Sequence, residues 1–242
     1  MLPLLPIATT ADEADRAATI AVLPVGSFEQ HGSHLPLATD TMIACVLATE
    51  IARRYDLLLL PPITVACSHE HVGWVGTVSI SSATLHAVIA DIAASLENGG
   101  IRRILIVNAH GGNYVLSNIV QEASIVEPRM ALFPGRDDWR SIREAVGCDE
   151  TDPYRDMHAG ELETSILLYA LPEVVRSSFR DTDHDANHRP HLLSLGMRGY
   201  TPSGVIGRPS TATADKGKAI IEGLVDLARP FVEILAPVKD PG

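Results

Sequence analysis

Residues 20–25, Ile20-Ala21-Val22-Leu23-Pro24-Val25, form an unbroken apolar run that ends at Gly26. Such a run, without polar alternation, is typical of a strand that is buried on both faces of a sheet. Three later runs have the same character, namely Leu57–Leu60, Ile104–Val107 and Met130–Phe133. The four runs therefore predict the strands of a sheet.

Helical periodicity separates these runs. Segment 39–51 begins at Thr39 or Asp40, either of which can act as its N-cap, and segment 81–98 begins at Ser81 or Ser82 and ends before Gly99. A third pattern covers residues 113–125. Strand–helix alternation at this spacing predicts right-handed crossovers and a mainly parallel α/β sheet with helices on both faces.

The last hundred residues are less regular. Glu163–Ala170 is predicted to be helical, residues 181–190 to be a polar loop, and residues 216–235 to be an amphipathic helix broken by Pro230. No repeat, low-complexity tract or linker divides the chain. We therefore expect a single domain over residues 1–242.

Composition limits the compartment and the partners. Hydrophobic residues make up 46% and charged residues 20% of the 242 residues, as in ordinary globular proteins. The net charge of −11 argues against nucleic acid or an anionic membrane as partner, because both attract basic surfaces. The three cysteines form no disulfide or zinc-ribbon pattern, and residues 1–6 make a poor signal peptide. These features favour the cytoplasm.

Polar side chains follow two of the predicted strands directly. The first strand leads into Glu29 and His31, the third leads into His110, and Asp40 begins the helix after the first strand. Because loops at the carboxyl ends of parallel strands converge, we expect these four side chains to meet. Taken singly, each could be an ordinary loop histidine or helix cap. Together, imidazole and carboxylate groups predict a site for Zn, Fe or Mn rather than Ca or Mg.

Four sequence blocks between residues 26 and 165 carry a resemblance to a known family. In chain order they are Gly26-Ser27-x-Glu29-Gln30-His31-Gly32-x-His34-Leu35-Pro36-Leu37-x-Thr39-Asp40; Ser68-x-Glu70-His71 with Gly76-Thr77; Asn108-x-His110-Gly111-Gly112-Asn113; and His158-Ala159-Gly160-x-x-Glu163-Thr164-Ser165. These blocks resemble the creatininase family. The resemblance implies a three-layer αβα sandwich, two divalent metal ions per subunit, and a homo-oligomer such as a hexamer or octamer.

The resemblance also implies which residues bind the metals. It places Glu29 and His110 on one ion, His31 on the other, and Asp40 on both. It further implies that His158 transfers a proton to the amide nitrogen, which leaves poorly as an anion.

One metal ligand departs from the pattern of creatininase itself. Creatininase has a glutamate ligand two residues after the histidine of its Asn-Gly-His block, where this chain has Gly112. We expect Glu163 to supply that carboxylate. Glu161 lies about 200° away around a helix and is then expected to be a surface residue.

Other polar residues are expected to play supporting roles. Five of them are predicted to touch the substrate or to hold the metal ligands: His34, Glu70, His71, Asn108 and Tyr154. For Glu70 and His71 a purely structural role is an equal alternative. Histidines at 184, 188 and 191 are expected to lie in a solvated loop, and His86 is not expected to be a ligand.

The substrate is predicted from a narrower resemblance. Creatininase encloses creatinine with tryptophans, and this chain has only Trp74 and Trp139. Residues 196–207 and 211–214 instead resemble the branch of the family that serves mycofactocin biosynthesis. Its members are peptidases that release a modified C-terminal Val-Tyr dipeptide from a small peptide precursor. Two alternatives stay open, namely a creatinine- or formamide-type amidohydrolase and a non-catalytic metal- or nucleotide-binding α/β module.

Overall fold

The central sheet is parallel throughout and has the strand order β2-β1-β3-β4. We describe a computed structural model, which covers residues 4–148 and 155–236. The strands are β1 (Ile20–Val25), β2 (Leu58–Leu59), β3 (Arg103–Asn108) and β4 (Met130–Phe133). The helices are α1 (Thr10–Arg16), α2 (Thr39–Tyr55), α3 (Ser82–Asn98), α4 (Val115–Ala123), α5 (Arg136–Ala145), α6 (Glu161–Ala170), α7 (Leu192–Leu195), α8 (Ala214–Leu227) and α9 (Arg229–Leu235).

Strand β1 is internal, and all six of its residues are buried. A proline is normally excluded from such a strand, because it cannot donate a backbone hydrogen bond. Pro24 is tolerated because β2 ends at Leu59, before it reaches this level of the sheet. The carbonyl of Pro24 still accepts a hydrogen bond from Ile63 N at 3.0 Å.

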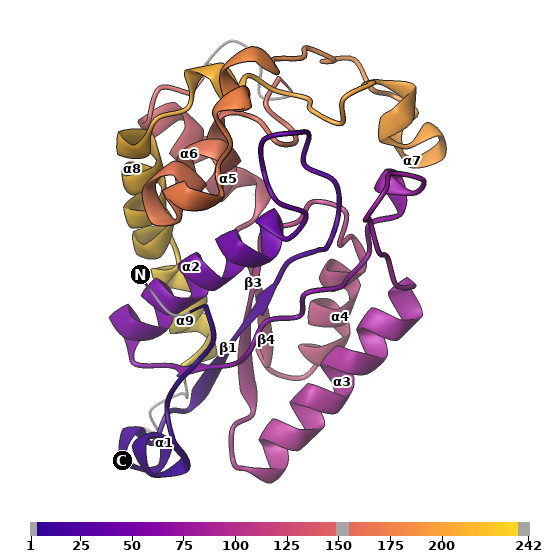
Figure 1. The fold of residues 1–242 in the computed structure, drawn as a ribbon. Helices are drawn as coiled ribbons and strands as arrows, with labels where there is room; N and C mark the ends of the chain where they lie inside the picture. Colours follow the sequence, from indigo (N-terminus) through magenta and orange to yellow (C-terminus); the bar gives the residue numbers. More distant parts are fainter. Residues whose placement is uncertain (1–3, 149–154, 237–242) are drawn as a thin grey trace.

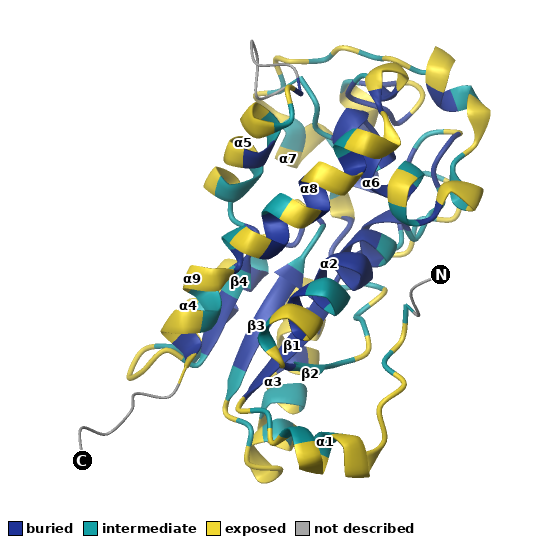
Figure 2. Ribbon diagram, turned by 90° about the vertical axis from the view of Figure 1, so that its left-hand side faces the viewer, coloured by how far each residue is buried: buried dark blue, intermediate teal, exposed yellow. Residues whose placement is uncertain are grey.

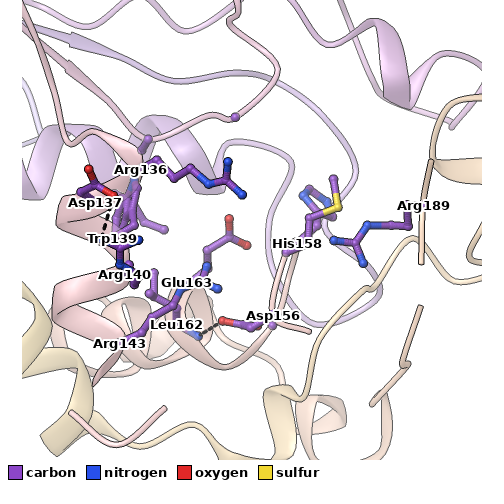
Figure 3. Close-up of a pocket in the computed structure, with 15 residues that line it drawn as sticks. Arg136, Asp137, Trp139, Arg140, Arg143, Asp156, His158, Leu162, Glu163 and Arg189 are labelled. Atoms are coloured by element: carbon purple, nitrogen blue, oxygen red, sulfur yellow. Dashed lines mark hydrogen bonds and ion pairs between the residues drawn. The ribbon is translucent and has the colours of Figure 1, made fainter. Parts of the chain in front are cut away.

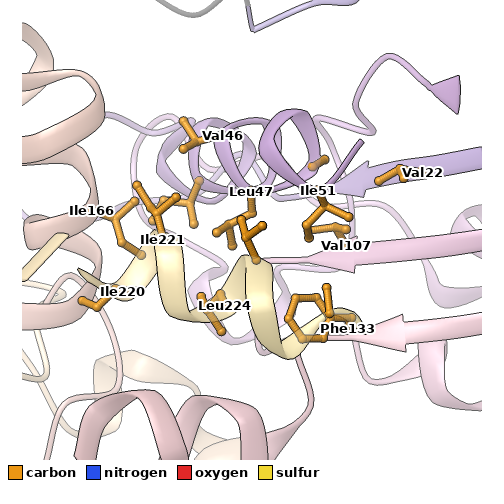
Figure 4. Packing of buried hydrophobic residues seen from close by; sticks show 14 of the residues in the cluster. Val22, Val46, Leu47, Ile51, Val107, Phe133, Ile166, Ile220, Ile221 and Leu224 are labelled. Carbon is orange, nitrogen blue, oxygen red and sulfur yellow. The ribbon is translucent and has the colours of Figure 1, made fainter. Parts of the chain in front are cut away.

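Apolar side chains of the strands alternate between two cores. Leu105 and Val107 of β3 join a core with α2, α6 and α8, whereas Ile104 and Ile106 join a core with α3 and α4. Figure 4 shows the first core, where Leu47 of α2 faces the sheet. Figures 1 and 2 show the helices on both sides of the sheet. The predicted three-layer αβα arrangement is therefore confirmed.

Several element boundaries differ from those predicted. Helix α2 has Ala38 as its N-cap, without a side-chain hydrogen bond, so Thr39 and Asp40 lie inside its first turn. Helix α3 is capped by Ser81, as predicted. The final helical segment breaks at Ala228, and Pro230 lies in the first turn of α9, which begins at Arg229. Sequence patterning did not predict α5. Within the residues described, no helix is long and apolar enough to cross a bilayer.

Candidate metal centre

The loop after β1 carries two of the predicted ligands, Glu29 and His31. It passes so close to α2 that a Cβ on Gly26 would lie 2.3 Å from the backbone nitrogen of Thr41. Glycine is therefore required where the strand ends. The same approach brings Asp40, in the first turn of α2, beside the loop.

The carboxylate of Asp40 lies between two histidines. Its Oδ1 is 3.1 Å from His31 Nε2, and its Oδ2 is 3.1 Å from His110 Nδ1. The other nitrogen of each ring donates to a backbone carbonyl, His31 Nδ1 to Glu29 at 3.0 Å and His110 Nε2 to Cys67 at 2.8 Å. Such backbone hydrogen bonds fix the ring orientation of metal-binding histidines. Both rings thus present one nitrogen toward the same carboxylate.

Glu29 is a buried carboxylate that lacks hydrogen bonds. Its oxygens lie 3.1 Å from His71 Nε2 and 3.2 Å from His110 Nε2, yet neither oxygen accepts a hydrogen bond from any residue described. The side chain is fully buried. Leaving a charge unsatisfied inside a protein is costly, and a bound cation removes that cost.

Glu163 approaches the same group of side chains from α6. Its Oε2 accepts a hydrogen bond from Ala159 N at 2.7 Å and lies 3.9 Å from His31 Nε2. Glu161 points elsewhere, but the expectation that it is a surface residue was wrong. It is only 5% exposed and pairs with Lys216, because α6 packs against α8 on that side.

The donor atoms fit two ions. Ligand atoms of Glu29, Asp40 and His110 lie within 4.8 Å of one another. The same holds for those of His31, Asp40 and Glu163, and for those of Glu29, His31 and His158. The side chains of Asp40, His110 and Glu163 line a cavity of about 110 Å³. One water molecule takes about 30 Å³ in the liquid, so the cavity has room for two ions and water. The mixture of imidazole and carboxylate donors suits Zn, Fe or Mn.

The charges within the centre shift the pKa values of its members. Burial alone would lower the pKa of both histidines, but nearby carboxylates, chiefly Asp40 for His31 and Glu29 for His110, raise it to about 9 for His31 and about 10 for His110. Burial raises the pKa of Glu29 to about 7 and that of Glu163 to about 8. Without metal, these four side chains therefore bind protons near neutral pH. Bound cations would take the place of those protons and neutralise the carboxylates.

His158 stands beside the predicted ligands. Its Nε2 donates to the carbonyl of Gln30 at 2.6 Å, which leaves Nδ1 as the acceptor nitrogen of the neutral ring. Backbone hydrogen bonds of 2.9 Å in both directions join it to Ile206. The following residue, Ala159, has a φ of +51°, a conformation that costs energy and often marks functional sites. The centre of the His158 ring is 4.2 Å from that of the His31 ring.

The environment of His158 disfavours a positive charge on the ring. Burial first, and then the charges of His31 and His71, hold its pKa well below the ordinary value. The ring is therefore neutral, with its proton on Nε2 and none on Nδ1.

Two of the predicted supporting residues hold backbone in place. His34 Nε2 donates to the carbonyl of Ala159 at 3.1 Å, so it braces the segment that carries His158. Asn108 Nδ2 donates to the carbonyl of His110 at 2.8 Å and so shapes the turn after β3. Tyr154 falls outside the described residues.

Glu70 fills the space that Gly112 leaves open. A Cβ on Gly112 would lie 2.1 Å from Glu70 Oε1 and 2.4 Å from His110 Nε2. Glu70 Oε1 is 3.8 Å from that same histidine nitrogen. The carboxylate of Glu70 and a side chain at position 112 therefore exclude each other.

Gln30 was not singled out from the sequence, although it lies within the first block. Its Nε2 is 2.9 Å from His71 Nδ1 and donates to the carbonyl of Gly204 at 3.1 Å, so it orients the imidazole of His71.

The exposed His86 lies near Glu122. His184 donates to the carbonyl of Tyr200.

Known proteins share the sequence pattern of this chain over most of its length. Residues 8–232 match the family described as "Creatininase: Creatinine amidohydrolase". The chain is 34% identical over 228 residues, 90% of its length and 86% of the relative's, to the mycofactocin precursor peptide peptidase of Mycolicibacterium smegmatis. It is 37% identical over 218 residues, 85% of its length and 81% of the relative's, to the same-named protein of Mycobacterium ulcerans.

The fold also matches that of solved structures. One of them, described as "Creatininase Mn", superposes with a TM-score of 0.81 at 23% identity and covers 96% of this chain and 98% of the other. Together with the family match over residues 8–232, this establishes that the chain belongs to the creatininase family.

Proposed function

We propose that this protein is a two-metal peptidase that releases the modified C-terminal Val-Tyr dipeptide from a mycofactocin precursor peptide. The observation that carries the catalytic part is the placement of Asp40 between His31 and His110, each with its other nitrogen fixed by a backbone carbonyl. The names of relatives that are 34% and 37% identical over most of the chain support the choice of substrate.

We take the metal ligands from the two groups of donor atoms that share Asp40, since this carboxylate lies between both histidines. Glu29, Asp40 and His110 would hold one ion, and His31, Asp40 and Glu163 the other. When bound, two such ions polarise a carbonyl and lower the pKa of water so that hydroxide forms near neutral pH. We propose Fe, Zn or Mn, because the donors mix imidazole with carboxylate.

His158 is placed to move the proton that amide cleavage requires. With Nε2 donating to the carbonyl of Gln30, only Nδ1 can accept a proton, and this atom lies 3.8 Å from Glu29 Oε1, inside the centre. We propose that Nδ1 takes a proton from the attacking water and delivers it to the leaving nitrogen. The neutral ring suits this role, since it must accept before it can donate.

A substrate comparison tests the proposal. The metal-loaded protein is incubated in parallel with a precursor peptide ending in Val-Tyr, with creatinine and with a formamide. We expect release of a dipeptide from the peptide and little turnover of the other two. Hydrolysis of creatinine or the formamide alone would replace the peptidase proposal with the amidohydrolase alternative.

A pair of histidine variants separates catalysis from metal binding. His158→Ala should lose hydrolysis by about 10²–10⁴-fold while it keeps its metal content. His86→Ala, at an exposed histidine of α3, is the matched control and should retain both. A His158→Ala protein with unchanged turnover would contradict the assigned role. Failure of every variant and wild type to cleave any amide would favour the non-catalytic module.

The assembly and compartment extend the same proposal. We propose a homo-oligomer, a hexamer or octamer, that acts in the cytoplasm; the resemblance to the family supports the assembly, and the three free cysteines fit a reducing compartment. Light scattering coupled to gel filtration would measure the subunit number. A monomer would contradict the assembly without affecting the proposed chemistry.

A further inference from the structure

A larger cavity opens beside the candidate metal centre. Its volume is about 720 Å³, within the range of pockets that hold small ligands. His158 and Glu163 line both this cavity and the smaller one among the metal-site residues. A substrate whose amide lies at the metal centre would therefore extend into it.

Arginines gather on the wall of this cavity. The chain has 30 acidic and 19 basic residues, yet the charged residues that line this cavity are four arginines and three acids: Arg136, Arg140, Arg143 and Arg189 with Asp137, Asp156 and Glu163. Basic groups gathered in a cleft attract anionic ligands, even when the net charge of the protein is negative.

Two of the arginines interact with carboxylates that line the same cavity. Arg140 pairs with Asp137 at 3.0 Å within the first turns of α5. Burial raises the pKa of the Asp156 carboxyl, and the positive charge of Arg143 partly offsets that rise. Asp156 in turn accepts hydrogen bonds from the first backbone N–H groups of α6.

The other two arginines face the cavity from opposite sides. Figure 3 shows the guanidinium groups of Arg136 and Arg189 pointing into the space above Glu163 and beside His158. Arg136 is the first residue of α5, directly after β4, and Arg189 lies in the loop before α7. Two elements more than fifty residues apart in sequence thus place guanidinium groups at one cavity.

The chemistry of a guanidinium identifies the ligand. Each group carries five N–H donors in a planar fork, and some of these donors serve contacts within the protein. Arg189 Nη1, for example, donates to the carbonyl of Ala186. A planar carboxylate matches this fork, and peptides supply carboxylates either on Asp and Glu side chains or at the chain end.

We propose that Arg136 and Arg189 form a carboxylate-binding subsite beside the metal centre, so that the preferred substrate is a peptide with a carboxylate near the scissile amide. This inference rests on the proposed peptidase function and specifies how it selects its substrate. The arginines bind and orient the peptide while the cleaved bond lies against His158.

Binding of four matched peptides tests the subsite. The peptides have eight residues and end in Val-Tyr. They carry either Glu or Gln at the two positions before valine, and either a free C-terminal carboxylate or an amide. Affinity is measured by calorimetry on metal-free protein, which cannot cleave them, and kcat/KM is measured separately on metal-loaded protein. The variants are Arg136→Gln, Arg136→Lys and Arg136→Gln with Arg189→Gln.

Arg102→Gln is the matched control, because Arg102 is exposed and directly precedes β3, at the amino end of the strands. We expect removal of the recognised carboxylate to weaken binding to wild type about tenfold to a hundredfold. The preference should disappear in the double glutamine variant and persist in Arg102→Gln. Arg136→Lys should fall between, since lysine keeps the charge but loses the fork.

The comparison of the four peptides identifies which carboxylate of the substrate is bound. A loss with Gln peptides assigns the subsite to acidic side chains, and a loss with amidated peptides assigns it to the chain end. Equal binding of all four peptides, or a preference that survives in a folded double variant, would overturn the inference. Because affinity is measured without cleavage, a failure of hydrolysis would count against the proposed function and leave the binding result valid.

Discussion

Replacing Gly112 by alanine adds a single methyl group at the most crowded point of the candidate metal centre. The new carbon would lie 2.1 Å from Glu70 Oε1 and 2.4 Å from His110 Nε2, both far inside van der Waals contact. Gly111 provides a matched control, because a Cβ there meets no described atom within 4 Å. The two variants differ by one position and have the same added volume.

The size of the effect follows from which neighbour can move. The carboxylate of Glu70 ends a flexible side chain and can swing away. The ring of His110 is only 4% exposed, and its Nε2 donates a hydrogen bond to the carbonyl of Cys67 at 2.8 Å. The ring can therefore move away only if this hydrogen bond breaks. Overpacking of this kind typically costs about 1–3 kcal/mol. Disturbing the hydrogen bond that orients a metal-binding histidine typically lowers metal affinity about 10–100-fold.

Metal titration and thermal unfolding measure these two effects. Gly112→Ala should bind metal more weakly by about one to two orders of magnitude and should unfold at a lower temperature, whereas Gly111→Ala should match wild type in both. Equal metal affinity for the two glycine variants would refute the idea that the space beside His110 is reserved for Glu70.

Three more predictions concern the same region. Glu163→Gln should weaken metal binding about 10–100-fold, by analogy with other changes around metal ligands. Glu161→Gln should keep metal affinity near wild type, and equal losses in the titration would contradict the ligand assignment. In metal-free protein, the raised pKa values of His31 and His110, about 9 and about 10 against an ordinary 6.5, give stability that is full below pH 6.5 and lost as the pH rises through 9 to 10. In the presence of a chelator, the unfolding temperature should therefore fall between pH 7 and pH 10. The metal-loaded protein should not show this loss, because bound metal takes the place of the protons. An unfolding temperature that stays constant in chelator would contradict the prediction. Gly26→Ala should cost about 1–3 kcal/mol in denaturant unfolding, because its Cβ would meet the backbone of Thr41 at 2.3 Å, and an unchanged midpoint would show that the loop can yield.

The strands and their buried character could be predicted from local sequence. The unbroken run Ile20–Val25 and the matching run in β3 predicted a parallel sheet with two covered faces, because only a strand buried on both sides lacks polar alternation. The N-cap of α2 was predicted wrongly, since the chain before it turns through a non-helical Ala38. Helix α5 was missed because its surface is largely charged, which leaves little apolar periodicity to recognise.

The burial of Glu161 illustrates what residue spacing leaves undetermined. Helix periodicity predicted that only one of the two glutamates of α6 could face the metal centre, but it did not reveal what the other one faces. Packing of α6 against α8 encloses Glu161 and pairs it with Lys216, 55 residues away. Such a contact depends on the relative placement of two helices, which no local pattern encodes.

The amino-acid sequence by itself determined the succession of the four strands and of the apolar helices between them. It also determined which residue types lie at the carboxyl edge of the sheet, because both features depend on residues close together in the chain. Only the tertiary structure decided which nitrogen of each histidine faces Asp40, that Glu70 fills the space beside Gly112, and that Arg136 and Arg189 face one cavity. These features arise where segments distant in sequence pack together, and the direction of a side chain there is set by steric exclusion and hydrogen bonds from the opposing segment.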